Sequence, residues 1–287
     1  MSPDLATRAD SRSSHITPRD HGRILRLGDD LAARLSRAIG STGRVHSVFA
    51  RAINVEWADG RLLTLHGPGP LRAPFAAAVE RVALLRAPRP DAPVIVEPGR
   101  LRLPGLVLTW DEAAPIGCAI PAPPPGLDRA VVDTLRHHGT GRATGLDSPR
   151  GVAARAALAG AIGSGDAARL VEAASGLLGL GEGLTPAGDD CLVGALAVLH
   201  AIGHPALVRP PTPAAAIARA AAERTTAVGR EFVVHALAGR FSEPMLTLLR
   251  ARAPLEAAEA ARRLAGLGAT SGMDTLAGLR LACLAAA

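Results

Sequence analysis

The segment from residue 179 to 190 reads GLGEGLTPAGDD and gathers glycines, a Thr-Pro step and two adjacent acidic side chains. Glycine tolerates positive φ angles, whereas Thr185, Pro186, Asp189 and Asp190 are residue types that favour the start of a helix. The pattern therefore predicts a loop that leads into a helix. Such a loop could hold a ligand, or it could serve only to begin the helix.

A second segment of the chain resembles this helix start. GDDCLVGAL, from Gly188, and GMDTLAGLR, from Gly272, both follow the pattern G-x-D-x-L-x-G, and a threonine precedes each. The aligned pairs are Gly188 and Gly272, Asp190 and Asp274, Leu192 and Leu276, and Gly194 and Gly278. Two helices are therefore predicted to begin in the same way.

Both helix starts have the chemistry of an anion site. Backbone N–H groups at a helix N-terminus lack intrahelical acceptors, and the positive end of the helix dipole lies there. Glycine at positions 194 and 278 would let the two helices approach closely. We therefore expect the helices to pack together, to direct both N-termini at one pocket and to bring Asp190 and Asp274 near each other.

Each aspartate also has a purely structural interpretation. Acidic residues in a first helical turn cap backbone amides and offset the dipole, for about 0.3–1 kcal/mol each. On this basis Asp189 is predicted to be a helix cap. Asp190 and Asp274 are the candidate catalytic residues, which would orient a substrate amide, transfer a proton or hold Mg²⁺. The sequence identifies no other cofactor and no set of metal ligands.

Common nucleotide and metal sites do not fit the chain. A Walker A loop requires G-K-[ST], but the chain has no lysine, and G-L-G-E-G-L does not satisfy G-x-G-x-x-G. The nine histidines form no H-E-x-x-H or comparable pattern. The counter-charge for an anion must therefore come from arginine. Arg224 beside Thr225 and Arg230 are candidates, because hydroxyls next to guanidinium groups suit a carboxylate or phosphate.

The first part of the chain is predicted to be rich in β-strands. Short β-prone runs occupy residues 43–120, and Asp59-Gly60 between two of them predicts a tight hairpin over residues 51–66. Helices are expected at residues 27–40 and, inserted among the strands, at residues 74–86.

The second part of the chain is predicted to be helical. IPAPPPGL, residues 120–127, contains four prolines that interrupt regular structure, and Ala-rich segments with helical spacing follow it. The predicted fold class is therefore α+β. We expect a disordered tail over residues 1–20, a β-rich lobe over residues 21–125 and an Ala-rich helical bundle over residues 126–287.

Composition excludes several classes of protein. The formal charge is +6, but all 32 basic residues are scattered arginines and aromatic residues make up only 2%, so nucleic-acid binding is not favoured. Three separated cysteines suggest neither a disulfide framework nor a zinc site. The first 20 residues are polar and contain no apolar core typical of a signal sequence, and no later apolar run reaches membrane-spanning length. We therefore expect a cytoplasmic protein that does not enter a membrane.

Three segments carry a resemblance to a known family. GLGEGLTPAGDD followed by CLVG, ATSGMDTLAG at residues 269–278 and GRVHSVFARAINV at residues 43–55 resemble its signatures and N-terminal strands. This bacterial family, long catalogued as a domain of unknown function, includes a subunit associated with the oxamate carbamoyltransferase of anaerobic allantoin degradation. The chain departs from the family pattern at Cys191, Gly229 and Ala269. The resemblance implies carbamoyl transfer between carbamoyl phosphate and oxamate, by an enzyme with several different subunits.

The resemblance implies a subunit or relative of an oxamate carbamoyltransferase that associates with protein partner subunits, and the paired helix starts predict that it binds a small anionic substrate. The alternative is a non-catalytic binding or scaffolding subunit. The candidate substrate-binding residues, which offer backbone or hydroxyl donors or a charge, are Gly181, Gly183, Thr185, Gly188, Asp189, Arg224, Thr225, Thr270, Ser271 and Gly272.

Overall fold

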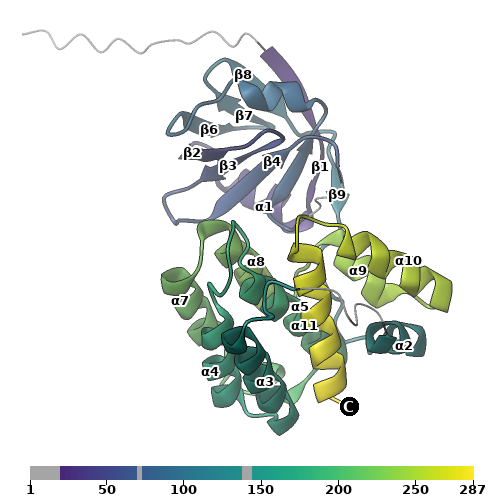
Figure 1. Ribbon diagram of the computed structural model, residues 1–287. Helices are drawn as coiled ribbons and strands as arrows, with labels where there is room; N and C mark the ends of the chain where they lie inside the picture. The colour runs from purple at the N-terminus through teal and green to yellow at the C-terminus, as the bar shows by residue number, and fades with distance from the viewer. Residues whose placement is uncertain (1–19, 70–72, 138–143) are drawn as a thin grey trace, which may run out of the picture.

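The computed structural model describes residues 20–69, 73–137 and 144–287 as two lobes, one built of strands and one of helices (Figure 1). The predicted α+β class is confirmed, because strands lie between residues 20 and 116 and α-helices, apart from one, follow residue 128. Nearly all of the predicted tail, residues 1–19, lies outside the described residues.

The strands of the described chain form one sheet in the order β5-β4-β3-β2-β6-β7-β8-β1-β9. β1 also pairs with β5, so the sheet closes on itself around a core of Leu, Val and Ile side chains. The strands are β1 (Asp20–Gly28), β2 (Thr42–Val48), β3 (Ala52–Glu56), β4 (Leu62–His66), β5 (Ala76–Val79), β6 (Pro93–Glu97), β7 (Arg100–Leu103), β8 (Leu106–Thr109) and β9 (Ala114–Ile116).

The predicted hairpin over residues 51–66 is confirmed as the antiparallel pair β3–β4, with Glu56 opposite Leu62. Its turn is wider than a two-residue turn, because the Trp57 amide donates to the Arg61 carbonyl at 3.1 Å. Only Gly60 in this turn has a positive φ, of 72°. The Asp59 carboxylate instead accepts a hydrogen bond from the Arg61 amide at 2.9 Å.

The helix predicted at residues 74–86 is wrong. Residues 76–79 form β5, and Val82–Arg86 form a short 3-10 helix. Alanine favours helices, but here the alanines of β5 pair with β4 on one side and with β1 on the other. Strand pairing in a buried sheet therefore overrides helix propensity. The helix predicted at residues 27–40 is confirmed as α1 (Asp29–Arg37).

The helical lobe is built around α5 (Ala187–Ile202), in which every residue from Ala187 to Leu199 is buried. A helix that is covered on all sides is typical of the centre of an all-α core. The others are α2 (Arg129–His137), α3 (Pro149–Ser164), α4 (Ala167–Leu177), α6 (Pro205–Val208), α7 (Ala214–Arg224), α8 (Ala227–Leu237), α9 (Glu243–Arg250), α10 (Pro254–Ala265) and α11 (Ser271–Ala285). In the described part of the chain, no helix is both long and apolar enough to cross a membrane.

The helical sequence of residues 214–237 is interrupted at Thr225 and Thr226, where α7 ends and α8 begins. The Thr226 hydroxyl accepts a hydrogen bond from the Gly229 amide at 2.9 Å. This contact caps the N-terminus of α8, so the Thr pair starts a new helix instead of continuing the old one.

Glycines hold α5 and α11 side by side, as the repeated motif predicted (Figure 1). A Cβ atom at Gly194 would overlap the Thr275 carbonyl oxygen, and one at Gly278 would overlap the Cys191 carbonyl oxygen. Each glycine therefore lets the backbone of one helix touch the backbone of the other. Because the contact fixes the positions of both helices, it also fixes where their N-termini lie.

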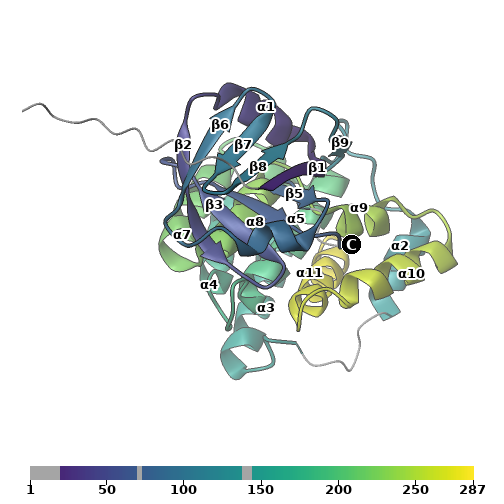
Figure 2. The ribbon, with the colours of Figure 1, turned by 90° about the horizontal axis from the view of Figure 1, so that it is seen from above.

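A buried ion pair joins the two lobes. Glu231 of α8 is fully buried and accepts hydrogen bonds from Arg61 Nε at 2.8 and 3.1 Å and from the Leu62 amide at 3.0 Å. Burial alone would raise the pKa of Glu231, but its contacts with His235 and Arg61, the Arg61 charge and the Leu62 amide hold that pKa below its usual value. α8 therefore receives the β3–β4 hairpin of the β-lobe, and α5 and α8 lie beneath the strands (Figure 2).

Substituting alanine for Gly194 is predicted to destabilise the protein, although alanine favours helices. The added methyl group must push α11 away from α5, and overpacking of this kind lowers the free energy of unfolding by about 1–3 kcal/mol. Urea unfolding followed by far-UV circular dichroism measures the change. Gly160→Ala, in α3 with no atom near the added Cβ, is the matched control and should stabilise by about 1 kcal/mol. A Gly194→Ala variant as stable as the wild type would contradict the close contact.

Candidate functional site

A cavity of about 280 Å³ lies where the two lobes meet. Pro74 of the β-lobe forms one wall, and α5, α8, α9, the α10–α11 loop and α11 form the others. Apolar side chains line most of the cavity, among them Val193, Phe232, Phe241 and Met245. A few polar side chains are placed in this apolar setting, as is typical of small-molecule sites.

The two glycine-rich helix starts meet at this cavity. Thr185, just before α5, and Ser271, at the start of α11, are hydrogen-bonded to each other through their hydroxyls at 2.8 Å. Both side chains line the cavity together with Asp190 and Gly272. The predicted convergence of the two helix N-termini on one pocket is therefore present in the fold.

Asp190 is the buried acid of this cluster, with 8% of its surface exposed. Its Oδ2 atom is buried and has no hydrogen-bond partner among the described residues. Burial raises the pKa of Asp190 to about 8, and the charge of Asp274 adds to the rise, while the nearby hydroxyls of Ser271 and Thr185 oppose it. Asp190 is thus a carboxyl group that gains or loses a proton near neutral pH.

Asp274 lies near Asp190 but belongs to a different set of contacts. Its Oδ1 atom accepts a hydrogen bond from the Gly145 amide at 2.8 Å, and its side chain is fully buried. Burial raises the pKa of Asp274, and the Gly145 amide and the Thr270 hydroxyl oppose the shift. Asp274 does not line the cavity, so its visible role is to attach the segment before α3 to α11.

Asp189 does not cap α5, which corrects the prediction. The N-cap of α5 is Pro186, and no side chain caps this helix. The Asp189 carboxylate instead accepts hydrogen bonds from the Gly179 amide at 2.8 Å and from the Thr225 hydroxyl. Asp189 and Thr225 therefore connect the end of α4 to the turn between α7 and α8.

Two of the backbone donors suggested by the sequence already have acceptors in the protein. The Gly188 amide donates to the Leu180 carbonyl at 2.7 Å, and the Gly272 amide donates to the Leu267 carbonyl at 3.0 Å. A Cβ at either glycine would overlap a neighbouring backbone carbonyl oxygen. These glycines therefore serve close packing, which corrects their proposed role as donors to a ligand.

The other predicted site residues lie outside the cavity. Gly181 and Gly183 are exposed in the loop before α5, where both have positive φ angles. Thr270 is exposed at the start of α11. Arg224 is exposed and does not line the cavity, and Arg230 donates to the Gly60 carbonyl in the β-lobe.

Four polar residues of the cavity were not predicted from the sequence: His235 of α8, Arg240 and Ser242 after it, and Thr275 of α11. Arg240 forms ion pairs with Asp29 at 2.8 Å and Asp30 at 3.6 Å, both at the start of α1. Nothing in the local sequence indicates this pairing across the lobes. For His235, an available signal was its i, i+4 spacing from Glu231 on an otherwise apolar helix.

The described residues contain no group of three His, Cys, Asp or Glu side chains arranged to hold a metal ion. Cys191, the residue after Asp190, is fully buried in the core, and burial raises the pKa of its thiol to about 12. A thiol with this pKa stays protonated at neutral pH and is a poor nucleophile.

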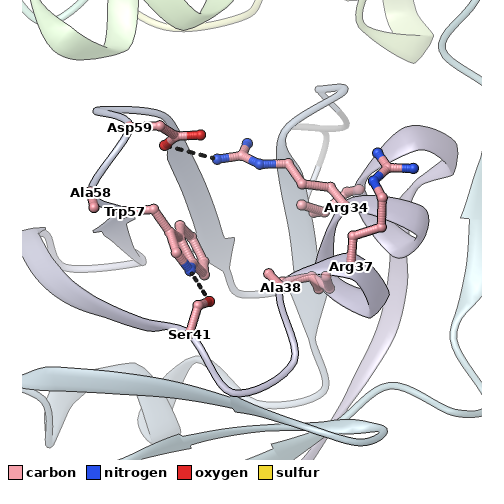
Figure 3. Close-up of a pocket in the computed structure, with 9 residues that line it drawn as sticks. Arg34, Arg37, Ala38, Ser41, Trp57, Ala58 and Asp59 are labelled. Carbon is pink, nitrogen blue, oxygen red and sulfur yellow. Dashed lines mark hydrogen bonds and ion pairs between the residues drawn. The ribbon is translucent and has the colours of Figure 1, made fainter.

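A second cavity, of about 300 Å³, lies within the β-lobe between α1 and the β3–β4 turn (Figure 3). Arg34 crosses above Trp57, 5.5 Å from the ring centre, and donates to the Leu62 carbonyl at 3.2 Å. Its guanidinium also lies 3.9 Å from Asp59, and Trp57 Nε1 donates to the Ser41 hydroxyl at 3.3 Å. These contacts hold the turn against α1. The cavity between the lobes is therefore the better candidate site.

The stability of an Asp190→Asn variant is predicted to differ from that of the wild type in a pH-dependent way. Because the pKa of Asp190 rises from 3.8 to about 8 on folding, the native state keeps a proton that the unfolded state loses between these values. The wild type therefore loses stability as pH rises through this window, and asparagine does not. The free energy of unfolding of the variant, relative to that of the wild type, should therefore rise by up to about 1.4 kcal/mol per pH unit. Urea unfolding from about pH 4 to 8 measures this difference. A difference that does not change with pH would contradict the shift.

Two family profiles match the chain. The profile described as oxamate carbamoyltransferase subunit AllH matches residues 177–283, and the profile described as the AllH family N-terminal domain matches residues 23–115. No curated protein sequence and no solved structure is significantly similar to the chain. The first profile spans both glycine-rich helix starts, and the second spans most of the closed sheet. The chain belongs to the AllH family of oxamate carbamoyltransferase subunits.

Proposed function

We propose that this chain is the substrate-binding subunit of an oxamate carbamoyltransferase and that the cavity between its lobes holds the small amide substrate. One observation carries the proposal: two matching helix starts, 80 residues or more apart in the sequence, bring Thr185, Ser271 and Asp190 together in one largely apolar cavity. Asp190 Oδ2 is buried there without a partner. A buried polar atom of this kind favours a ligand that can satisfy it.

The chemistry of carbamoyl transfer supports a role for Asp190. When the amide nitrogen of oxamate attacks the carbamoyl carbon of carbamoyl phosphate, a C–N bond forms, phosphate leaves and the nitrogen loses one proton. In the reverse direction the same nitrogen regains that proton. A carboxyl group with a pKa near neutral can both accept and return a proton, as general acid–base catalysis requires. Thr185 and Ser271 would orient the substrate through their hydroxyls.

The charge of the cavity supports a need for protein partners. Carbamoyl phosphate and oxamate are both anions, yet Arg240 is the one arginine that lines the cavity in the described part of the chain. Asp29 and Asp30 already neutralise it. The two helix N-termini add positive potential, but a phosphate group calls for further cations. We propose that partner subunits supply them, which accords with the description of the family as a subunit.

The proposal is tested by turnover of the assembled enzyme. With the partner subunits present, Asp190→Asn should lower kcat for carbamoyl transfer at least 100-fold, the usual contribution of a general acid or base. Phosphate release from carbamoyl phosphate in the presence of oxamate measures the rate.

Asp133→Asn, on the exposed face of α2, is the matched control and should retain full activity. Unchanged kinetics in Asp190→Asn would overturn the role of Asp190. The wild-type chain should show no turnover until the partners are added. If Asp190→Asn assembles normally and oxamate binds only to the other subunits, this chain is a scaffold.

A further inference from the structure

His235 of α8 lines the same cavity as the two helix starts, and no role follows for it from the sequence. We propose that His235 carries its ring proton on Nδ1 and donates it to an oxygen of the bound substrate, while Arg61 of the β-lobe occupies Nε2. The substrate oxygen would belong to a small carboxylate or carbamoyl group. This inference rests on the proposed function, because it assigns a donor to the same cavity.

The contact with Arg61 determines which ring nitrogen carries the proton. The Arg61 guanidinium lies 3.0 Å from His235 Nε2. A guanidinium has only donors, so Nε2 must accept this hydrogen bond with its lone pair. The Glu231 carboxylate also lies near Nε2, but at 3.5 Å, the limit for a hydrogen bond. In the neutral ring the proton is therefore on Nδ1.

The orientation of the ring is fixed from both sides. Arg61 cannot move away from Nε2, because its Nε atom is hydrogen-bonded to both oxygens of the buried Glu231 carboxylate. Phe75 stacks against the imidazole, with ring centres 5.6 Å apart and planes within 19°. Phe232 in turn packs edge-on against Phe75. A donor held in this way loses little conformational entropy when a ligand binds.

The second ring nitrogen has no hydrogen-bond partner among the described residues. In the described part of the chain no group is hydrogen-bonded to His235 Nδ1, and this atom is not among the buried polar atoms that lack a partner. It therefore retains some access, and the cavity between the lobes is where His235 is exposed. Arg61 of the β-lobe thus determines which ring nitrogen of His235 carries the proton that can be donated to a substrate.

The tautomer is tested directly by NMR on the full-length ¹⁵N-labelled chain. Long-range ¹H–¹⁵N correlation distinguishes the protonated from the unprotonated ring nitrogen, and loss of the signals in His235→Gln assigns them. With the ring neutral, we expect a protonated Nδ1 and an unprotonated Nε2, whether or not a ligand binds. A protonated Nε2, donating to Glu231, would overturn the inference.

The two roles of the ring are separated by two variants, with oxamate as the probe. His235→Gln places an acceptor where Nε2 lies but has no donor at Nδ1. Its melting temperature should stay near that of the wild type, while its Kd for oxamate should rise about tenfold, the loss expected for one hydrogen bond. His235→Asn keeps a donor near Nδ1 but loses the acceptor for Arg61. It should bind oxamate within about threefold of the wild type and melt at a lower temperature.

His46→Gln, on β2 of the β-lobe and away from the cavity, is the matched control and should change neither quantity. Unchanged oxamate affinity in a stable His235→Gln would overturn the donor role. If the wild type binds neither oxamate nor oxalurate, the proposed function fails. The tautomer measured by NMR still decides whether Nε2 accepts a hydrogen bond from Arg61. If His235→Asn does not fold, His235→Gln and the NMR experiment decide the outcome.

Discussion

The contact between α5 and α11 is the constraint on which the candidate site depends. Because Gly194 and Gly278 have no side chains, each helix lays its backbone against a carbonyl group of the other. The two helices can then begin at the same place, where Thr185 reaches Ser271. The same close packing buries Asp190 and raises its pKa to about 8. Packing and acid–base character are therefore two consequences of one arrangement.

The β-lobe takes part in the site through the lobe junction. Arg61 follows the β3–β4 turn, binds the buried carboxylate of Glu231 and contacts His235, which lies one helical turn further along α8. Asp29 and Asp30 at the start of α1 hold Arg240. A buried ion pair is weak support for stability in itself, but it strongly disfavours separation of the partners. The junction thus keeps His235 and Arg240, two of the polar residues that line the cavity, in place.

Much of the helical half of the site could be predicted from the sequence. The G-x-D-x-L-x-G repeat contains both the glycines of the contact between α5 and α11 and the aspartates at the start of each helix. The role of Asp189 could not be predicted, because its partners Gly179 and Thr225 belong to other elements. His235 depends on a residue 174 positions away, a distance that no local pattern spans. The alanines of β5 predicted a helix for a related reason, since only the neighbouring strands make them part of a sheet.

The central claim is that the two helix starts form one binding site between the lobes. A crystal structure of the chain with oxamate, or with oxalurate, tests it most directly. The account predicts the ligand in the cavity, with its amide at Asp190 and its oxygens near Ser271 and His235. A ligand bound instead beside Trp57 in the β-lobe, with the cavity between the lobes holding only water, would contradict it.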